Sequence, residues 1–147
     1  MIYGNHNKQV EIQQQNRNRL LKALADIGIA QAFVHYSGGG DSGDVTDVTA
    51  LPAELAPKLP DTKVSFLQVT PTYYLKQDGN LPEIQERPLT LKAALEEFAM
   101  IWVELHHGGW ENNDGGSGSV TFNVAENTCS LEHLEYYTES TRYEYEL

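Results

Sequence analysis

The chain has 147 residues, and its 21 carboxylates outnumber its 10 Lys and Arg residues to give a formal net charge of -11. This length fits a single domain, residues 1–147. The negative charge disfavours direct binding to nucleic acid or to a membrane and favours a basic protein as partner. Cys129 is the only cysteine, which excludes an intramolecular disulfide and a cysteine-based zinc site. The polar N-terminal stretch lacks a signal peptide, so a cytoplasmic location is expected.

The first predicted elements are a helix and a hairpin. Apolar residues recur at helical spacing within 9–27, and a glycine follows where a helix end favours one. Strands are predicted over 31–37 and over 44–51 from their β-branched and aromatic residues. The glycine-rich loop between them has the spacing of a dinucleotide-binding loop, but a strand rather than a helix follows it. A hairpin is therefore predicted here.

The middle of the chain is rich in proline. Pro52, Pro57 and Pro60 predict irregular structure or one short helical turn. A third strand is predicted over 63–70, and residues 71–88, with three prolines, are predicted to form a surface insertion.

The clearest predicted element is a second helix, because apolar residues recur at helical spacing from Leu91 to Leu105. Thr90 is placed to cap its start. Two strands are then predicted from alternating apolar residues, with Cys129 on the inward face, and a last strand from 143–147. The order of elements predicts an α+β fold, an antiparallel sheet of about five to six strands with two helices packed on one face.

Two loops rich in Asp and Gly carry oxygen atoms of the kind that a hard cation binds. If the loops meet in space, a divalent cation could bind between Asp41, Asp44 and Asp114. The simpler interpretation is a set of turns in which Asn and Asp bond their own backbone. No cofactor is expected otherwise. The residues of this predicted loop site are Asp41, Ser42, Trp110, Glu111, Asn113 and Asp114.

The C-terminal stretch from Glu126 interleaves six glutamates with tyrosines and holds Arg142 as its one cation. Such a pattern is common on a solvated strand face. It also suits binding to a basic protein, because carboxylates pair with Arg and tyrosine supplies rigid contact area. The predicted partner-binding residues are Glu132, Glu135, Tyr136, Tyr137, Glu144 and Tyr145.

Catalysis is not favoured by the remaining polar residues. His106 and His107 are adjacent, so on a helix their side chains diverge by about 100° and cannot easily bind one ion. No His-Glu-x-x-His motif or nucleophile elbow is present. Cys129, predicted to face inward, reads as a small inert apolar residue.

At the two loops the sequence resembles an uncharacterised family of small acidic bacterial proteins. The resemblance rests on Tyr36-Ser37-Gly38-Gly39-Gly40-Asp41-Ser42-Gly43 and on Gly109-Trp110-Glu111-Asn112-Asn113-Asp114-Gly115, and residues 52–88 lie outside it. It implies a bacterial origin, often among mobile genetic elements beside anti-restriction functions, and it assigns no activity.

These observations favour a small acidic interaction protein, a monomer or a homodimer, that is not an enzyme. Its partner would be a basic protein, such as a nucleic-acid-handling defence complex that it inhibits. The alternative is a divalent-metal-binding protein or metal-dependent enzyme that uses the two loops.

Overall fold

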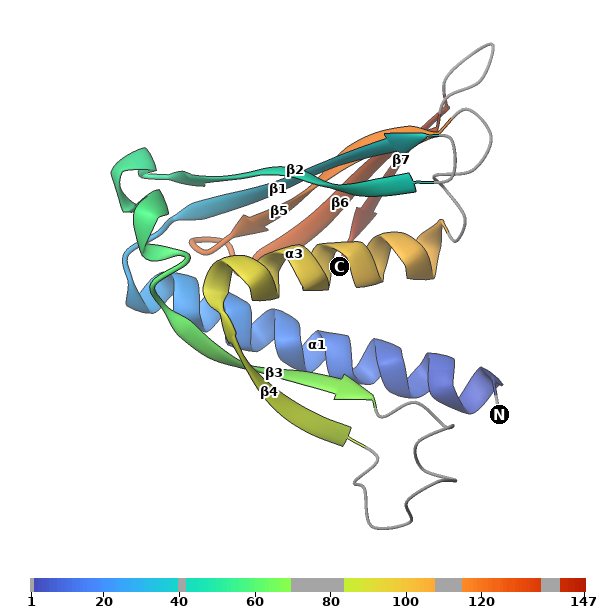
Figure 1. Cartoon of the computed structure of the whole chain (residues 1–147), viewed down its shortest axis with the longest axis horizontal. Helices are drawn as coiled ribbons and strands as arrows, with labels where there is room; N and C mark the ends of the chain where they lie inside the picture. The colour runs from blue at the N-terminus through green and yellow to red at the C-terminus, as the bar shows by residue number, and fades with distance from the viewer. Residues whose placement is uncertain (1, 40–41, 70–83, 108–114, 136–140) are drawn as a thin grey trace.

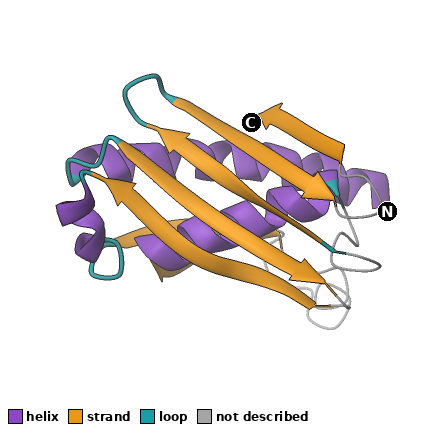
Figure 2. Cartoon of the chain, turned by 90° about the horizontal axis from the view of Figure 1, so that it is seen from above, coloured by secondary structure: helices purple, strands orange, loops and turns teal. Residues whose placement is uncertain are grey.

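The computed structural model describes residues 2–39, 42–69, 84–107, 115–135 and 141–147. A five-stranded sheet, a pair of helices and a two-stranded ribbon follow one another as layers (Figure 1). Both long helices lie on the same face of the sheet, as the view from above also shows (Figure 2). The α+β class and the packing of two helices on one face are therefore confirmed.

The main sheet is antiparallel throughout and has the strand order β2-β1-β5-β6-β7. β1 and β2 form the predicted hairpin, with Gly38 opposite Gly43. β1 also pairs with β5, so that Val34 lies opposite Val120 from the other half of the chain. The strands are β1 (Gln31–Gly39), β2 (Ser42–Leu51), β5 (Gly116–Asn123), β6 (Thr128–Glu135) and β7 (Thr141–Glu146).

The two long helices are α1 (Ile2–Asp26) and α3 (Leu91–His106). α1 begins before the predicted start at residue 9. Gly28 follows its end with a φ of 86°, in the left-handed region that glycine adopts without strain. The start of α3 is capped as predicted, because the hydroxyl oxygen of Thr90 accepts a hydrogen bond from Ala93 N at 3.1 Å. A short 3-10 helix, η1 (Ala53–Lys58), follows Pro52.

The ribbon is the main departure from the prediction. β3 (Lys63–Val69) does not join the main sheet but pairs with β4 (Ile84–Thr90). β4 includes residues 84–88, which were predicted to belong to a surface insertion, whereas 70–83 lie outside the described residues. Pro88, which has no N–H, lies in β4 opposite Ser65. A proline is tolerated there because each strand of a two-stranded ribbon has one edge that needs no partner.

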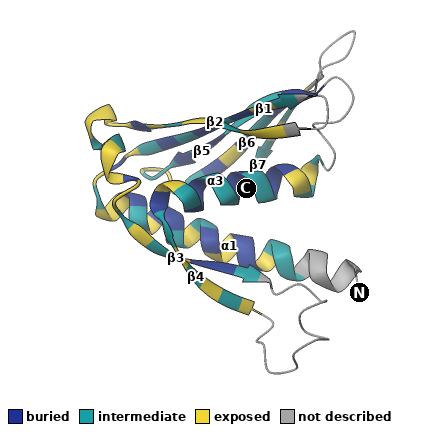
Figure 3. Ribbon diagram, viewed as in Figure 1, coloured by how far each residue is buried: buried dark blue, intermediate teal, exposed yellow. Residues whose placement is uncertain are grey.

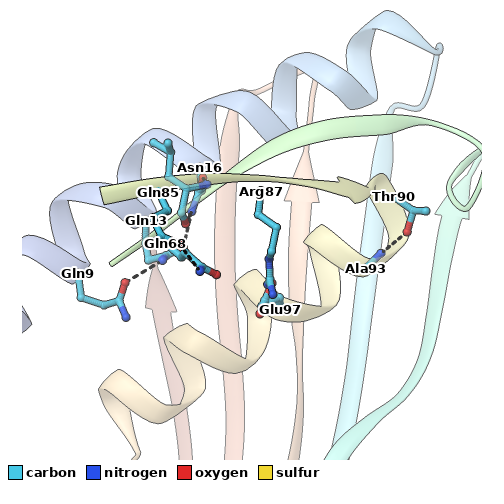
Figure 4. Close-up of polar contacts among 10 residues, drawn as sticks. Gln9, Gln13, Asn16, Gln68, Gln85, Arg87, Thr90, Ala93 and Glu97 are labelled. Carbon is cyan, nitrogen blue, oxygen red and sulfur yellow. Dashed lines mark hydrogen bonds and ion pairs between the residues drawn. The ribbon is translucent and has the colours of Figure 1, made fainter. Parts of the chain in front are cut away.

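Helix α1 holds the ribbon through a ladder of amide side chains (Figure 4). Asn16, fully buried, donates to Leu67 O and accepts from Leu67 N, each at 2.9 Å. Its amide nitrogen also donates to Gln13, which in turn donates to Gln9. In an antiparallel pair the N–H and C=O of one residue point the same way, so Asn16 covers the edge of β3 that faces away from β4.

The apolar core lies between the sheet and the helices, where buried residues line the facing sides of both layers (Figure 3). Phe98 and Trp102 of α3 pack edge to face, and Phe98 also meets Phe122 of β5 with ring centroids 5.5 Å apart. Arg17 of α1 donates to Asn127 O at 2.6 Å and to Leu147 O at 3.2 Å, which ties the helix to the ends of the last three strands. In the described residues, every helix is too short or too polar to cross a membrane.

Replacing Asn16 by Ala leaves both backbone groups of Leu67 buried without their partner. We expect the free energy of unfolding to fall by about 2–4 kcal/mol, measured by urea denaturation. Gln15, exposed on the same helix, supplies the matched control, and Gln15→Ala should change stability by less than about 0.5 kcal/mol. Similar losses for both variants would show that the clamp contributes nothing beyond helix propensity.

Candidate functional site

The C-terminal hairpin has two chemically different faces. Glu132 of β6 lies directly opposite Glu144 of β7, and because its neighbour Leu131 is buried toward the helices, both glutamates lie on the other, open face of the sheet. Tyr145, the next residue along β7, lies opposite the buried Leu131 and is half-buried on the helix side. Successive side chains of a strand point to opposite faces. The predicted surface of mixed glutamate and tyrosine is thus divided, with Glu132 and Glu144 outside and Tyr145 inside.

Arg142 lies between the two outer glutamates. Its guanidinium pairs with Glu132 at 2.5 Å and also contacts the carboxylate of Glu144. The hydrogen bond and charge of Glu132, together with the charge of Glu144, raise the pKa of Arg142 above its ordinary value. All three side chains are well exposed, so these pairs position the carboxylates more than they stabilise the fold.

The strand register extends this patch into a row across the whole sheet. Successive cross-strand neighbours on the open face are Asp47, His35, Ser119, Glu132 and Glu144, one from each strand. With strands roughly 4.8 Å apart, the row spans about 19 Å. We call this set the acidic row. The sequence alone could not assemble it, because Asp47 joins Glu132 only through the order of the strands.

Further side chains on the open face border the acidic row. Phe33 stacks against His35 with ring centroids 6.5 Å apart, which places an aromatic pair beside Asp47. Glu146, exposed and opposite Ser130, adds a carboxylate at the β7 end. No described element covers this face (Figure 1).

Most of the predicted loop site lies outside the described residues, namely Asp41, Trp110, Glu111, Asn113 and Asp114. Two of the predicted partner-binding residues, Tyr136 and Tyr137, also lie outside them. Ser42 and Glu135 are placed by their backbones, at the first position of β2 and the last position of β6. The strand ends that flank these loops lie side by side, since Gly38 pairs with Gly116 and Gly116 pairs with Glu135.

Asp44 is the one metal candidate within the described residues. It is exposed in β2, and its Oδ1 accepts a hydrogen bond at 2.7 Å from the N–H of Val45, the next residue of the strand. Throughout the described ranges, no group of three or more His, Cys, Asp and Glu side chains is arranged to hold a metal ion.

A histidine and a tyrosine meet inside the core beneath the glycines of β5. His133 of β6 is fully buried, and its Nδ1 is hydrogen-bonded to the hydroxyl of Tyr36, which is 1% exposed. Gly118 makes room for this pair, because a Cβ there would lie 2.5 Å from Tyr36 Oη and 2.1 Å from Glu132 O. Gly116 does the same beside the His133 ring, with a Cβ position 3.3 Å from Cε1. Cys129, Leu131 and His133 alternate along β6, so the inward face predicted for Cys129 also holds His133. This signal in the sequence was missed.

The end of α3 closes over this pair. His107 stacks on His133 with ring centroids 4.1 Å apart, while His106 stacks on Tyr145 at 4.3 Å. Both histidines contact Tyr145 of β7, and His107 also contacts His133 of β6. Stacked imidazoles present their faces to each other, and their nitrogen lone pairs lie in the ring planes. The geometry of His107 and His133 thus fastens the helix to the sheet and does not direct both rings at one ion.

Cys129 lies on the inward face of β6, as predicted, and is fully buried. Burial raises the pKa of its thiol from 9.0 to about 12, an effect that the charge of Arg17 only partly offsets. The thiolate, which is the reactive form, is therefore suppressed in the native protein.

A methyl group at Gly118 has no room. Gly118→Ala should lower the free energy of unfolding by about 1–3 kcal/mol, since either the Tyr36 ring or the β5–β6 backbone must shift, and urea denaturation measures the loss. The adjacent Ser119, on the open face of the same strand, is the control position, and Ser119→Ala should stay within about 0.5 kcal/mol of the parent. A Gly118→Ala protein as stable as the Ser119→Ala protein would contradict the close packing described here.

The raised thiol pKa also predicts a dependence of stability on alkaline pH. Above pH 9 the unfolded chain releases the Cys129 proton while the folded chain keeps it, so stability falls as pH rises toward about 12. Urea denaturation between roughly pH 8 and pH 10.5 should show a steeper loss for the parent than for Cys129→Ala, in which the tyrosines still titrate. Parallel curves for the two proteins would mean that the thiol titrates normally in the fold.

Comparison with known proteins gives the chain a family but no activity. No curated protein and no solved structure matches it. Residues 12–147 match a family of unknown function, DUF6878. The matched range includes 52–88, which the sequence analysis had placed outside its resemblance to an uncharacterised family. With most of its length matched, the chain belongs to the family of unknown function DUF6878.

Proposed function

We propose that this protein is a non-enzymatic binding module whose open sheet face engages a basic surface on a partner protein. The observation that carries the proposal is the acidic row, in which Asp47, Glu132 and Glu144 lie on one line across five paired strands. Carboxylates on one face attract a cationic partner over a distance of about one Debye length, roughly 8–10 Å. The net charge of -11 acts in the same direction.

The rigidity of the sheet supports binding through this face. Each carboxylate of the row extends from a strand that is hydrogen-bonded to at least one neighbour, so little backbone entropy is lost when a partner docks. Arg142 keeps Glu132 and Glu144 close together before any partner arrives. Phe33 and His35 add aromatic contact area, a part that was predicted for Tyr136, Tyr137 and Tyr145.

A basic cleft that normally binds nucleic-acid phosphate is the partner surface that fits this arrangement best. Within the proposal, the protein is a cytoplasmic factor that inhibits a nucleic-acid-handling defence complex by occupying such a cleft with carboxylates. The support is the charge and its placement on an uncovered face. Origin in a mobile genetic element remains an expectation from the sequence resemblance.

The test compares two triple variants with the same change in net charge. The first variant changes three residues of the acidic row to Lys: Asp47, Glu132 and Glu144. The second variant changes three exposed glutamates away from the open face to Lys: Glu11, Glu54 and Glu126. Each tagged protein and the parent are used to capture proteins from nuclease-treated bacterial lysate, and the captured proteins are quantified by mass spectrometry. We expect the parent and the second variant to capture the same basic protein. The first variant should capture at least tenfold less of it, which corresponds to about 1.4 kcal/mol of binding free energy.

The outcome that would overturn the proposal is equal loss from both variants, which would make the interaction a matter of total charge. The proposal would also be overturned if the parent captured no more of any basic protein than the first variant does. Circular dichroism of all three proteins checks that the substitutions leave the fold intact.

A further inference from the structure

Helix α3 carries a second apolar stripe that the sheet does not cover. Its first stripe, which includes Leu95, Phe98 and Trp102, is buried against the strands. Met100, Ile101 and Leu105 lie on another side of the helix and are only partly buried. An amphipathic helix that packs on a single layer needs one apolar stripe, so the second one requires its own explanation.

Two adjoining cavities lie along this stripe. One, of about 450 Å³, is bordered by Val45 of β2, Leu89 of β4 and Ala93 of α3. The other, of about 330 Å³, is bordered by Ile101 and Leu105 and reaches Gln9 of α1. Glu97 and Met100 line both cavities, so together they form one groove along α3. We call it the α3 groove.

The rim of the α3 groove is negatively charged. Its carboxylates are Asp44, Glu96, Glu97 and Glu104. The one cation among the lining residues, Arg87 of β4, is ion-paired with Glu97 (Figure 4). An apolar floor between carboxylates complements an apolar surface flanked by Lys or Arg.

The floor of the groove decides the backbone form of its occupant. In the cavity bordered by Ile101 and Leu105, every lining residue belongs to a helix whose backbone groups are bonded within it, so this part of the groove offers no strand edge to an extended peptide. The edge strands β2 and β4 border only the other cavity. An occupant that packs on Ile101 and Leu105 must therefore satisfy its own N–H and C=O groups, which a helix does. From Ala93 to Leu105 the groove follows α3 for about 18 Å, the length of a three-turn helix.

We propose that the α3 groove binds a basic amphipathic helix, about three turns long, of a partner protein. Apolar residues at i, i+3, i+4 and i+7 of that helix pack on Met100, Ile101 and Leu105, and Lys or Arg residues beside them pair with Glu96 and Glu104. The flexible thioether chain of Met100, at the junction of the two cavities, adapts to differing apolar anchors. This site lies in the helix layer and does not involve the acidic row.

The probe is a fluorescein-labelled peptide of about 14 residues, with Leu at helical i, i+3, i+4 and i+7 spacing and Lys elsewhere. A second peptide of the same composition has its Leu and Lys order scrambled to remove the apolar stripe. Fluorescence anisotropy in about 150 mM salt should show saturable binding of the first peptide and at least tenfold weaker binding of the second, or about 1.4 kcal/mol. Equal binding of the two peptides would reduce the interaction to charge and overturn the proposal.

Variants locate the site. Met100→Lys, in the floor, and Glu104→Lys, on the exposed rim, should each weaken binding of the amphipathic peptide at least fivefold. Leu51→Lys makes the same kind of change as Met100→Lys at a site 49% exposed in β2, and should leave affinity within twofold of the parent. Since Glu104 is exposed, its variant keeps the test valid if Met100→Lys fails to fold. Unchanged affinity in Glu104→Lys would overturn the proposal.

A final variant separates this site from the open sheet face. Asp47→Asn, Glu132→Gln and Glu144→Gln, combined in one protein, should leave affinity for the peptide within about twofold. If this protein loses its affinity for the peptide while Glu104→Lys retains it, the peptide binds the acidic row. The groove proposal would then fail, and the proposal for the open sheet face would stand.

Discussion

The period of two along each strand of the main sheet is the constraint on which the other features depend. Side chains such as Val34, Val120 and Leu131 point at the helices, so their neighbours in sequence must point away from them. A shift of one residue in register would bury Glu132 and Glu144 and expose the core, so burial of the inner face fixes the position of every charge on the outer one. Packing of the core therefore determines where the carboxylates of the acidic row lie, although the row itself is on the opposite face of the sheet.

Polar contacts fix the parts of the fold that apolar burial would leave free to slide. The ribbon buries Phe66 and Leu67 of β3, and the directional hydrogen bonds of Asn16 to Leu67 select one position along the helix. The same placement sets the wall of the α3 groove, since β4 carries Leu89 and Arg87 beside α3. At the opposite end of the helix layer, stacking of His107 on His133 has a comparable role. A buried amide and a buried imidazole thus determine how the three layers are aligned.

Local patterns in the sequence predicted the elements well and their assembly poorly. The periodic apolar residues of α3, the Thr90 cap and the β1–β2 hairpin were all predicted, because each depends on neighbours within a few residues. β4 was missed because Pro88 marks it as irregular, and only its position in a ribbon with one free edge makes that proline acceptable. Of the predicted partner-binding residues Glu132, Glu144 and Tyr145, the two glutamates lie together on the open face, and their role in binding stays a prediction. Alternation along β7 separates the tyrosine from them, and strand order supplies Asp47 instead.

The pairing of β1 with β5 bears on how the chain reaches this structure. β1 is an inner strand of the sheet, and one of its two neighbours, β5, comes from the C-terminal half, so their pairing joins residues far apart in sequence. A fold of such high contact order closes slowly, because the entropy of a long loop is lost before the contacts that compensate for it form. During synthesis, the β1–β2 hairpin leaves the ribosome with an apolar face that has no helix to cover it until α3 emerges, and β1 lacks its second neighbour until β5 follows. The carboxylates already present in these unfinished chains, Asp44 and Asp47 of β2 among them, then have a further consequence, because their charge opposes association of one such chain with another.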